Sequence, residues 1–209
     1  MPLDPARERL VQLALRDCAS PANITYGEVR PTHVVDYKEQ RWPIVTDCSG
    51  WYQCLCYAAG LPDPMGTGYA GAGAGGCEGY TGSLLSYLKP IPLASVVPGD
   101  VCVFGAYPGR HCVVFLTTGQ APTVEVGSNG QPADPVRTTL ASEAAGFPGQ
   151  AVTYLQLPAP AAVSTRWVVR DLRGELLGTT GHPVRWALRH PKAFRAHGEV
   201  SFHKGVTYS

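Results

Sequence analysis

The chain has 209 residues, of which 44% are hydrophobic, enough for one medium domain with a buried core and a small second unit. Its formal net charge is +1, so no overall field favours nucleic acid as a partner. Only 16% of the residues are charged, and the 24 Gly and 19 Pro residues indicate many turns and short elements rather than long helices.

The N-terminus, "MPLDPARERLVQLAL", is charged and lacks the apolar stretch of a signal peptide. No apolar run along the chain approaches the length of a membrane span. We therefore expect a chain that is made in the cytoplasm and that something else must release or carry if it acts elsewhere. Its seven cysteines have no recognisable disulfide spacing, so most are expected to be buried free thiols.

The first half of the chain predicts helices. Residues 5–18 have apolar positions at helical spacing, and a polar, extended region follows to residue 46. Asp47 then caps a second helix, which ends at Gly60 before Leu-Pro. Because this second helix is apolar nearly all round, we expect it to be a buried central helix.

The second half predicts a sheet. A Gly-rich loop at 62–80 and a short helix at 81–89 lead into strand-like runs separated by turn residues. The first three runs predict an antiparallel meander. The strand-like sequences are "VCVFG", "HCVVFL", "TVEVG" and, later, "AVTYLQL" at 151–157.

Residues 158–162, "PAPAA", have the composition of a linker, and residues 163–209 predict a small ββαβ-like module. This module is basic, with eight Lys and Arg residues against three Asp and Glu, and it carries four of the six histidines. We therefore expect one domain at 1–158 and a separate module at 163–209.

Three cysteines within nine residues raise the question of which one does chemistry. Cys48 follows the helix cap, where free backbone N–H groups and the helix dipole favour a thiolate, and the small Ser49 and Gly50 leave its sulfur accessible. Cys54 and Cys56 lie in mid-helix among apolar neighbours, which raise a thiol pKa. Cys48 is therefore the candidate nucleophile, with buried filler as the alternative interpretation.

A cysteine nucleophile needs a base, and His111 is the candidate. It begins a strand directly after the turn "YPGR", so rigid backbone holds it at the open end of that strand. The alternative is a surface histidine at the end of a turn.

These residues carry a resemblance to a known family. Asp47-Cys48-Ser49-Gly50, an aromatic-rich helix ending in Gly-Leu-Pro, the segment "KPIPLASVVPGDVCVFG" and the His-led strand follow one another in order. Over about residues 10–157 the chain resembles the NlpC-type cell-wall cysteine peptidases, and it looks most like versions encoded by phages of actinobacteria. The resemblance implies an α+β, papain-like fold in which N-terminal helices pack on an antiparallel sheet.

The resemblance also implies an activity, the hydrolysis of an amide bond in the peptide stems of peptidoglycan. Cys48 matches the family's nucleophile and His111 its general base. Asp47 and Ser49 match positions that bind the free amine of the stem peptide, and Tyr26 matches a tyrosine that lines the active site. No metal or other cofactor is implied.

The third catalytic residue of the family is a polar group on the strand after the histidine, where it orients the imidazole. Here that region reads "VEVGSNGQP". Asn129 is the first choice, because Asn has this role in other papain-like enzymes. Ser128 and Glu125 are the alternatives.

Several roles remain open under this interpretation. The enzyme would serve phage lysis or open the wall as part of a virion; alternatively the chain is a tail-tip or assembly protein with a mainly structural peptidase domain. An N-acetylmuramoyl-L-alanine amidase and an acyltransferase are further alternatives. The basic module would bind wall glycopolymers or phage tail proteins, or would present an ordinary solvated face. Neither nucleic acid nor a membrane span is expected.

Two other patterns in the sequence are weak. "GAGAGG" at 71–76 contains G-x-G-x-x-G, but it follows no strand and no acidic residue lies about twenty positions further on, so dinucleotide binding is disfavoured. Cys54 and Cys56 invite a zinc interpretation, but a one-residue spacer in a helix puts the two sulfurs on different faces. We expect no metal.

Overall fold

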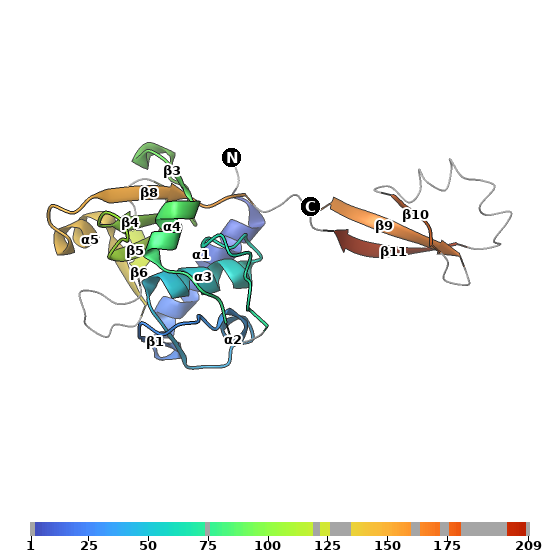
Figure 1. Cartoon of the computed structure of the whole chain (residues 1–209), viewed down its shortest axis with the longest axis horizontal. Helices are drawn as coiled ribbons and strands as arrows, with labels where there is room; N and C mark the ends of the chain where they lie inside the picture. The colour runs from blue at the N-terminus through green and yellow to red at the C-terminus, as the bar shows by residue number, and fades with distance from the viewer. Residues whose placement is uncertain are drawn as a thin grey trace. The chain divides into compact units, whose positions relative to one another are not determined.

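The computed structural model describes residues 3–73, 76–118, 122–125, 135–159, 164–171, 176–180 and 200–207, with the backbone course alone for 122–125 and the last three segments. The chain forms two compact units, residues 1–159 and 160–209 (Figure 1). No helix in the described part is both long and apolar enough to cross a membrane.

The helices of the first unit precede its sheet, with one exception late in the chain. A 3₁₀ turn follows the first helix at Pro21–Asn23 and another lies at Leu93–Ser95. The α-helices are α1 (Pro5–Ala19), α2 (Val34–Lys38), α3 (Cys48–Ala59), α4 (Thr81–Tyr87) and α5 (Leu140–Gly146).

The sheet of the first unit has six described strands in the order β3-β8-β4-β5-β6-β7, and all neighbours are antiparallel. A short parallel pair, β1 (Ile24–Tyr26) with β2 (Ile44–Thr46), stands apart from it. The six strands are β3 (Lys89–Pro90), β4 (Val101–Phe104), β5 (His111–Phe115), β6 (Pro122–Glu125), β7 (Val136–Thr139) and β8 (Val152–Gln156). The predicted α+β class, helices packed on an antiparallel sheet, is confirmed.

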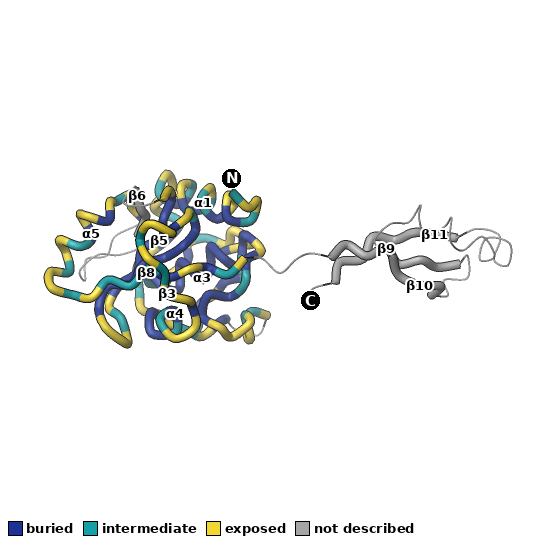
Figure 2. The backbone as a smooth tube through the Cα atoms, turned by 90° about the horizontal axis from the view of Figure 1, so that it is seen from above, coloured by how far each residue is buried: buried dark blue, intermediate teal, exposed yellow. Residues whose placement is uncertain are grey.

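Helix α3 is the central helix that the sequence predicts. The Asp47 side chain accepts the N–H of Gly50 at 2.7 Å, and Gly60 ends the helix in the left-handed conformation with φ 77°. Every residue of α3 except Tyr57 is buried. Figure 2 shows the buried segments of this unit in dark blue. Because the helix is enclosed on all sides, its first turn is held in one position.

A buried carboxylate joins the three N-terminal helices. Asp17 of α1 is fully buried, and it accepts the hydroxyl of Tyr37 at 2.6 Å and the indole N–H of Trp51 at 2.8 Å. Tyr37 belongs to α2 and Trp51 to α3, so one acidic side chain fixes all three helices to one another. Hydrogen bonds to a charged acceptor are stronger than neutral ones, which suits this role.

The sheet is covered on both faces. Val101, Val103, Cys112 and Val114 pack in the large core that contains α3. The alternate residues of the same strands face a second, smaller core that includes the first residue of α5 and Phe147 just beyond it. The described members of that core on the sheet are Cys102, Phe104, Val113 and Phe115.

The predicted strands at β4, β5, β6 and β8 are confirmed, but β7 and α5 are elements that the sequence did not predict. Helix α5 has seven residues, too few for a clear helical period in the hydrophobic pattern. The region before α3 was expected to be extended and instead also contains α2 and the β1–β2 pair, which are equally short.

The second unit contains a three-stranded antiparallel sheet among its described residues, in the order β10-β9-β11. Its strands are β9 (Ser164–Asp171), β10 (Leu176–Thr180) and β11 (Val200–Thr207). They match the predicted hairpin and final strand of the module. The helix predicted between them lies outside the described residues.

A second buried carboxylate joins α1 to the sheet, and it generates a stability prediction. Arg7 donates to Asp100 at 2.8 Å and to the carbonyl of Leu157, while Asp100 also accepts the N–H of Leu157 at 3.0 Å. Asp100 is fully buried and Arg7 is 7% exposed. Removing one partner of such a pair leaves an uncompensated buried charge.

We therefore expect Arg7→Met to lower the free energy of unfolding by about 3 kcal/mol or more, measured by urea denaturation. The matched control is Arg9→Met, an exposed position on the same helix, which should change stability by less than about 0.5 kcal/mol. Equal stability of the two variants would show that the Arg7–Asp100 pair does not hold α1 to the sheet.

Candidate active site

Cys48 is the first residue of α3, directly after the capping Asp47, and its side chain is 6% exposed. The first-turn N–H groups of a helix have no acceptor within that helix, and they carry the positive end of its dipole. The local sequence thus places one sulfur at the electropositive start of a helix that packing holds still.

The surroundings lower the pKa of the Cys48 thiol to about 5. The largest cause is a hydrogen bond from the Cys112 thiol, and a hydrogen bond from His111 and the charge of that imidazole lower the pKa further. Burial and the negative charge of Asp47 act in the opposite direction. Cys48 is therefore a thiolate at neutral pH, the form that acts as a nucleophile.

The other six cysteines have the opposite property. Burial is the largest cause of a raised thiol pKa at each of them, reaching about 11 at Cys18 and Cys77. The remaining four are raised further, namely Cys54, Cys56, Cys102 and Cys112. Cys54 and Cys56 are completely buried in α3, as expected from their mid-helix positions.

His111 is the first residue of β5 and is 4% exposed. By alternation along β5 its side chain belongs to the face of Val113, the face that α5 covers, while Cys112 belongs to the face of α3. Its ring is stacked with that of Phe147, at 5.3 Å between centroids and 12° between planes. A position at the end of the strand puts the imidazole between the two helices.

Glu143 of α5 lies beside His111, and the sequence analysis did not single it out. Its carboxylate Oε2 lies 3.5 Å from Nε2 of His111, and it is 5% exposed. The signal for it is present but short. Leu140, Glu143 and Phe147 follow at helical spacing, so an acidic residue occupies the apolar face of a helix.

The predicted third residues are not placed against His111 by the described structure. Asn129 and Ser128 lie outside the described residues. Glu125 is the last residue of β6, where the backbone alone is described. The prediction of Asn129 therefore stays a prediction.

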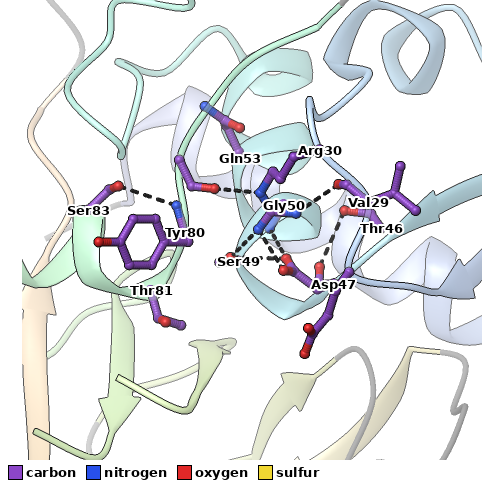
Figure 3. Close-up of polar contacts among 12 residues, drawn as sticks. Val29, Arg30, Thr46, Asp47, Ser49, Gly50, Gln53, Tyr80, Thr81 and Ser83 are labelled. Atoms are coloured by element: carbon purple, nitrogen blue, oxygen red, sulfur yellow. Dashed lines mark hydrogen bonds and ion pairs between the residues drawn. The ribbon is translucent and has the colours of Figure 1, made fainter. Parts of the chain in front are cut away.

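Asp47 and Ser49 are engaged with Arg30. Its guanidinium donates to Asp47 at 2.5 Å and to Ser49 at 2.9 Å, and it also donates to the carbonyl of Gly79 at 2.6 Å (Figure 3). Ser49 in turn donates to Asp47 at 2.9 Å. The two side chains thus form one network with an arginine that the sequence analysis did not single out.

Tyr26 lies near the nucleophile, at the end of β1. Burial, and after it the negative charge of Cys48, raises the pKa of the Tyr26 hydroxyl to about 12. The same region contains an open surface hollow next to the start of α3, which we call the acidic hollow. It is lined by Glu28, Arg30, Asp47, Glu78, Gly79 and Tyr80.

Gly50 lies in the first turn of α3, at a position that has no room for a side chain. A Cβ on it would lie 2.3 Å from Oγ1 of Thr46 and 2.9 Å from Oγ1 of Thr32. Within the described part of the chain, no group of three or more His, Cys, Asp or Glu residues is arranged to hold a metal ion.

Comparisons with known proteins give structural likenesses only. No family model matches the chain, and no curated protein matches it. One solved structure similar to it is the P60 domain of an antigen from M. avium subspecies paratuberculosis, with 13% identity, a TM-score of 0.42, and 72% of this chain and 96% of that one covered.

Two further solved structures are similar to the chain. A mutated form of RipA, the resuscitation promoting factor interacting protein, has 17% identity, a TM-score of 0.40 and coverage of 74% of this chain and 66% of its own. A hypothetical invasion protein of Mycobacterium tuberculosis has 17% identity, a TM-score of 0.38 and coverage of 75% and 66%. Any activity of this chain therefore has to be inferred from its own residues.

The thiol at position 48 gives a direct prediction. The difference in ultraviolet thiolate absorbance between the wild type and Cys48→Ser should titrate with a midpoint at about pH 5, against about 8.5 for an ordinary cysteine. Cys112→Ala removes the thiol that donates to Cys48, so it should raise the midpoint by about one unit or more.

Cys18→Ala, in α1, is the control and should leave the midpoint unchanged. A midpoint above about pH 8 in the wild type would contradict a stabilised thiolate at Cys48.

Proposed function

We propose that the chain is a cysteine peptidase that hydrolyses an amide bond in the peptide stems of peptidoglycan. The observation that carries the proposal is the contrast among the seven thiols, because only Cys48 has a lowered pKa and it is the one that a histidine contacts. The choice of peptidoglycan rests on the resemblance of the motifs around Cys48 and His111 to the NlpC-type family.

The thiolate of Cys48 attacks the amide carbonyl carbon, and the carbonyl π electrons move to the oxygen. The imidazolium of His111 then gives its proton to the amide nitrogen as the C–N bond breaks, which leaves a thioester on Cys48. Water, deprotonated by the neutral imidazole, attacks the thioester. The carboxylic acid product leaves, and the thiolate–imidazolium pair is restored.

The first turn of α3 supports this reaction in two ways. The backbone N–H of Cys48 belongs to the N–H groups that the helix itself does not use, so it is available to an oxyanion formed beside the sulfur. Asp47 fixes where the helix begins by accepting the N–H of Gly50. The nucleophile and the oxyanion donor therefore come from one rigid turn.

The acidic hollow is the proposed place for the free amine of the stem peptide. Glu28, Asp47 and Glu78 supply three carboxylates and Arg30 one guanidinium, so its formal charge is −2 and favours an ammonium group. Arg30 already donates hydrogen bonds to Asp47 and Ser49. Glu28 and Glu78 are exposed, so their carboxylates are the ones accessible to a ligand.

The biological setting is proposed from the sequence alone. We propose a phage enzyme that acts on the wall after release or as part of a virion tail. Residues 163–209, basic in composition, would bind wall glycopolymers or tail proteins. The amidase and the mainly structural tail protein remain the alternatives.

The proposal predicts that Cys48→Ala and His111→Ala each abolish cleavage of purified peptidoglycan while the fold is retained. The measurement is mass spectrometry of the released fragments, with circular dichroism as the check on folding. Cys77→Ala, a buried thiol with a raised pKa, is the matched control and should cleave like the wild type. Cleavage by Cys48→Ala at the wild-type rate would contradict the mechanism.

The same fragments separate the alternatives. New amino termini within the stem identify an endopeptidase, and release of intact stems from muramic acid identifies an amidase. Intact peptidoglycan after incubation with folded wild-type protein would favour the structural role.

The acidic hollow generates a further prediction. Glu28→Gln and Glu78→Gln should each raise KM for a stem peptide with a free amine by about 2- to 5-fold, because exposed ion pairs contribute about 0.5–1 kcal/mol. KM for the same peptide with its amine acetylated should not change. Glu39→Gln, on an exposed residue at the end of α2, is the control. An unchanged ratio of the two KM values in both variants would place the amine elsewhere.

A further inference from the structure

Two buried ionisable groups, His111 at the start of β5 and Glu143 of α5, face each other. Oε2 of Glu143 lies 3.5 Å from Nε2 of His111, and the two residues are 5% and 4% exposed. A carboxylate that is taken out of water needs a partner that stabilises its charge, since burial alone costs several kcal/mol. The geometry supplies His111 as such a partner.

The position of Glu143 is fixed by the packing of α5. Thr139 caps the helix by accepting the N–H of Ser142 at 3.1 Å, and Leu140 is buried in the core beneath the sheet. Phe147, just beyond the helix, stacks on His111 at 5.3 Å and on Phe104 at 5.1 Å. One short helix therefore brings both a carboxylate and an aromatic ring to the imidazole.

The aromatic rings restrict how the imidazole can turn. His111 is nearly parallel to Phe147, with 12° between the planes, and to Phe104, with 21°. Stacking defines the plane of the ring but not which nitrogen faces which neighbour. A carboxylate beside Nε2 restricts that choice, because it can accept a hydrogen bond from the Nε2–H and so favours this orientation of the ring.

We propose that Glu143 is the positioning residue of the active site: it accepts the Nε2–H of His111, fixes the ring orientation and stabilises the imidazolium that pairs with Cys48. This inference rests on the proposed function. It places the third member of the site on α5, after β7, and not on the segment directly after β6 that contains Asn129. Glu143 touches neither the thiol nor the substrate in this proposal.

Among the described side chains, the titratable groups near the imidazole include residues of α3, β5 and α5. Cys48 lies on α3, Cys112 follows His111 on β5, and Glu143 lies on α5. Cys102 of β4 is close enough to Glu143 for the carboxylate to add to the effect of burial on that thiol. Glu143 therefore approaches the imidazole from α5, whereas Cys48 approaches it from α3.

The test compares Glu143→Gln with Asn129→Ala in hydrolysis of stem peptide across a pH series. Glu143→Gln is nearly isosteric but cannot carry the negative charge. We expect kcat to fall by about tenfold or more, within the range known for groups that orient a catalytic imidazole, with KM unchanged. The alkaline limb of the pH–rate profile should move to lower pH, because the imidazolium loses its stabilising charge.

The control is Ser142→Ala, an exposed side chain in the same turn, which should match the wild type. Glu143→Asp keeps the charge but shortens the side chain, so it should retain the wild-type alkaline limb with a reduced kcat. If Glu143→Gln fails to fold, Glu143→Asp becomes the test variant, and a wild-type kcat in it would overturn the proposal. Wild-type kcat and pH profile in folded Glu143→Gln would also overturn it, whatever Asn129→Ala does.

Alkylation of Cys48 by iodoacetamide reads the same site without a peptidoglycan substrate. Glu143→Gln should shift the pH dependence of the alkylation rate relative to the wild type, and Ser142→Ala should not. A shift in alkylation together with no cleavage by the wild type would disprove the proposed function and support the positioning role. Cleavage by the wild type with no shift in Glu143→Gln would disprove only the positioning role.

Discussion

The carboxylate of Asp47 is the contact on which the site depends. One oxygen accepts the N–H of Gly50 and so determines that α3 begins at Cys48. The other oxygen accepts Arg30, which bridges to Gly79 on the opposite wall of the acidic hollow. The Asp47 side chain thus fixes Cys48 as the first residue of α3 and also holds Arg30 in the acidic hollow.

That arrangement has an electrostatic cost, which the surrounding charges offset. The negative charge of Asp47 raises the pKa of Cys48, and so does burial. Arg30 forms an ion pair with Asp47 at 2.5 Å, while Cys112 and His111 donate to the sulfur and lower its pKa. The low pKa of Cys48 therefore depends on side chains from β5 as well as on the start of α3.

The sequence predicted those elements whose bounds are determined by neighbouring residues in the chain. The cap at Asp47, the stop at Gly60 and the absence of a polar face predicted α3 and its burial, and turn residues separated the strands correctly. It was insufficient for Arg30, which reaches Asp47 across 17 positions, and for α5, whose seven residues are too few to show a period. Contacts between distant short elements leave little trace in a single sequence.

Glu143 was not singled out from the sequence for the same reason. The sequence analysis looked for a group that orients the imidazole on the strand after the histidine, and Asn129, its first choice there, stays a prediction. In this protein the imidazole lies at the end of β5, at the boundary of two cores, and a helix on the second face reaches it. Because β5 alternates, its first residue can face one helix while the next residue, Cys112, donates to a thiol on the other. His111, at the start of β5, therefore lies within reach of both Cys48 on α3 and Glu143 on α5.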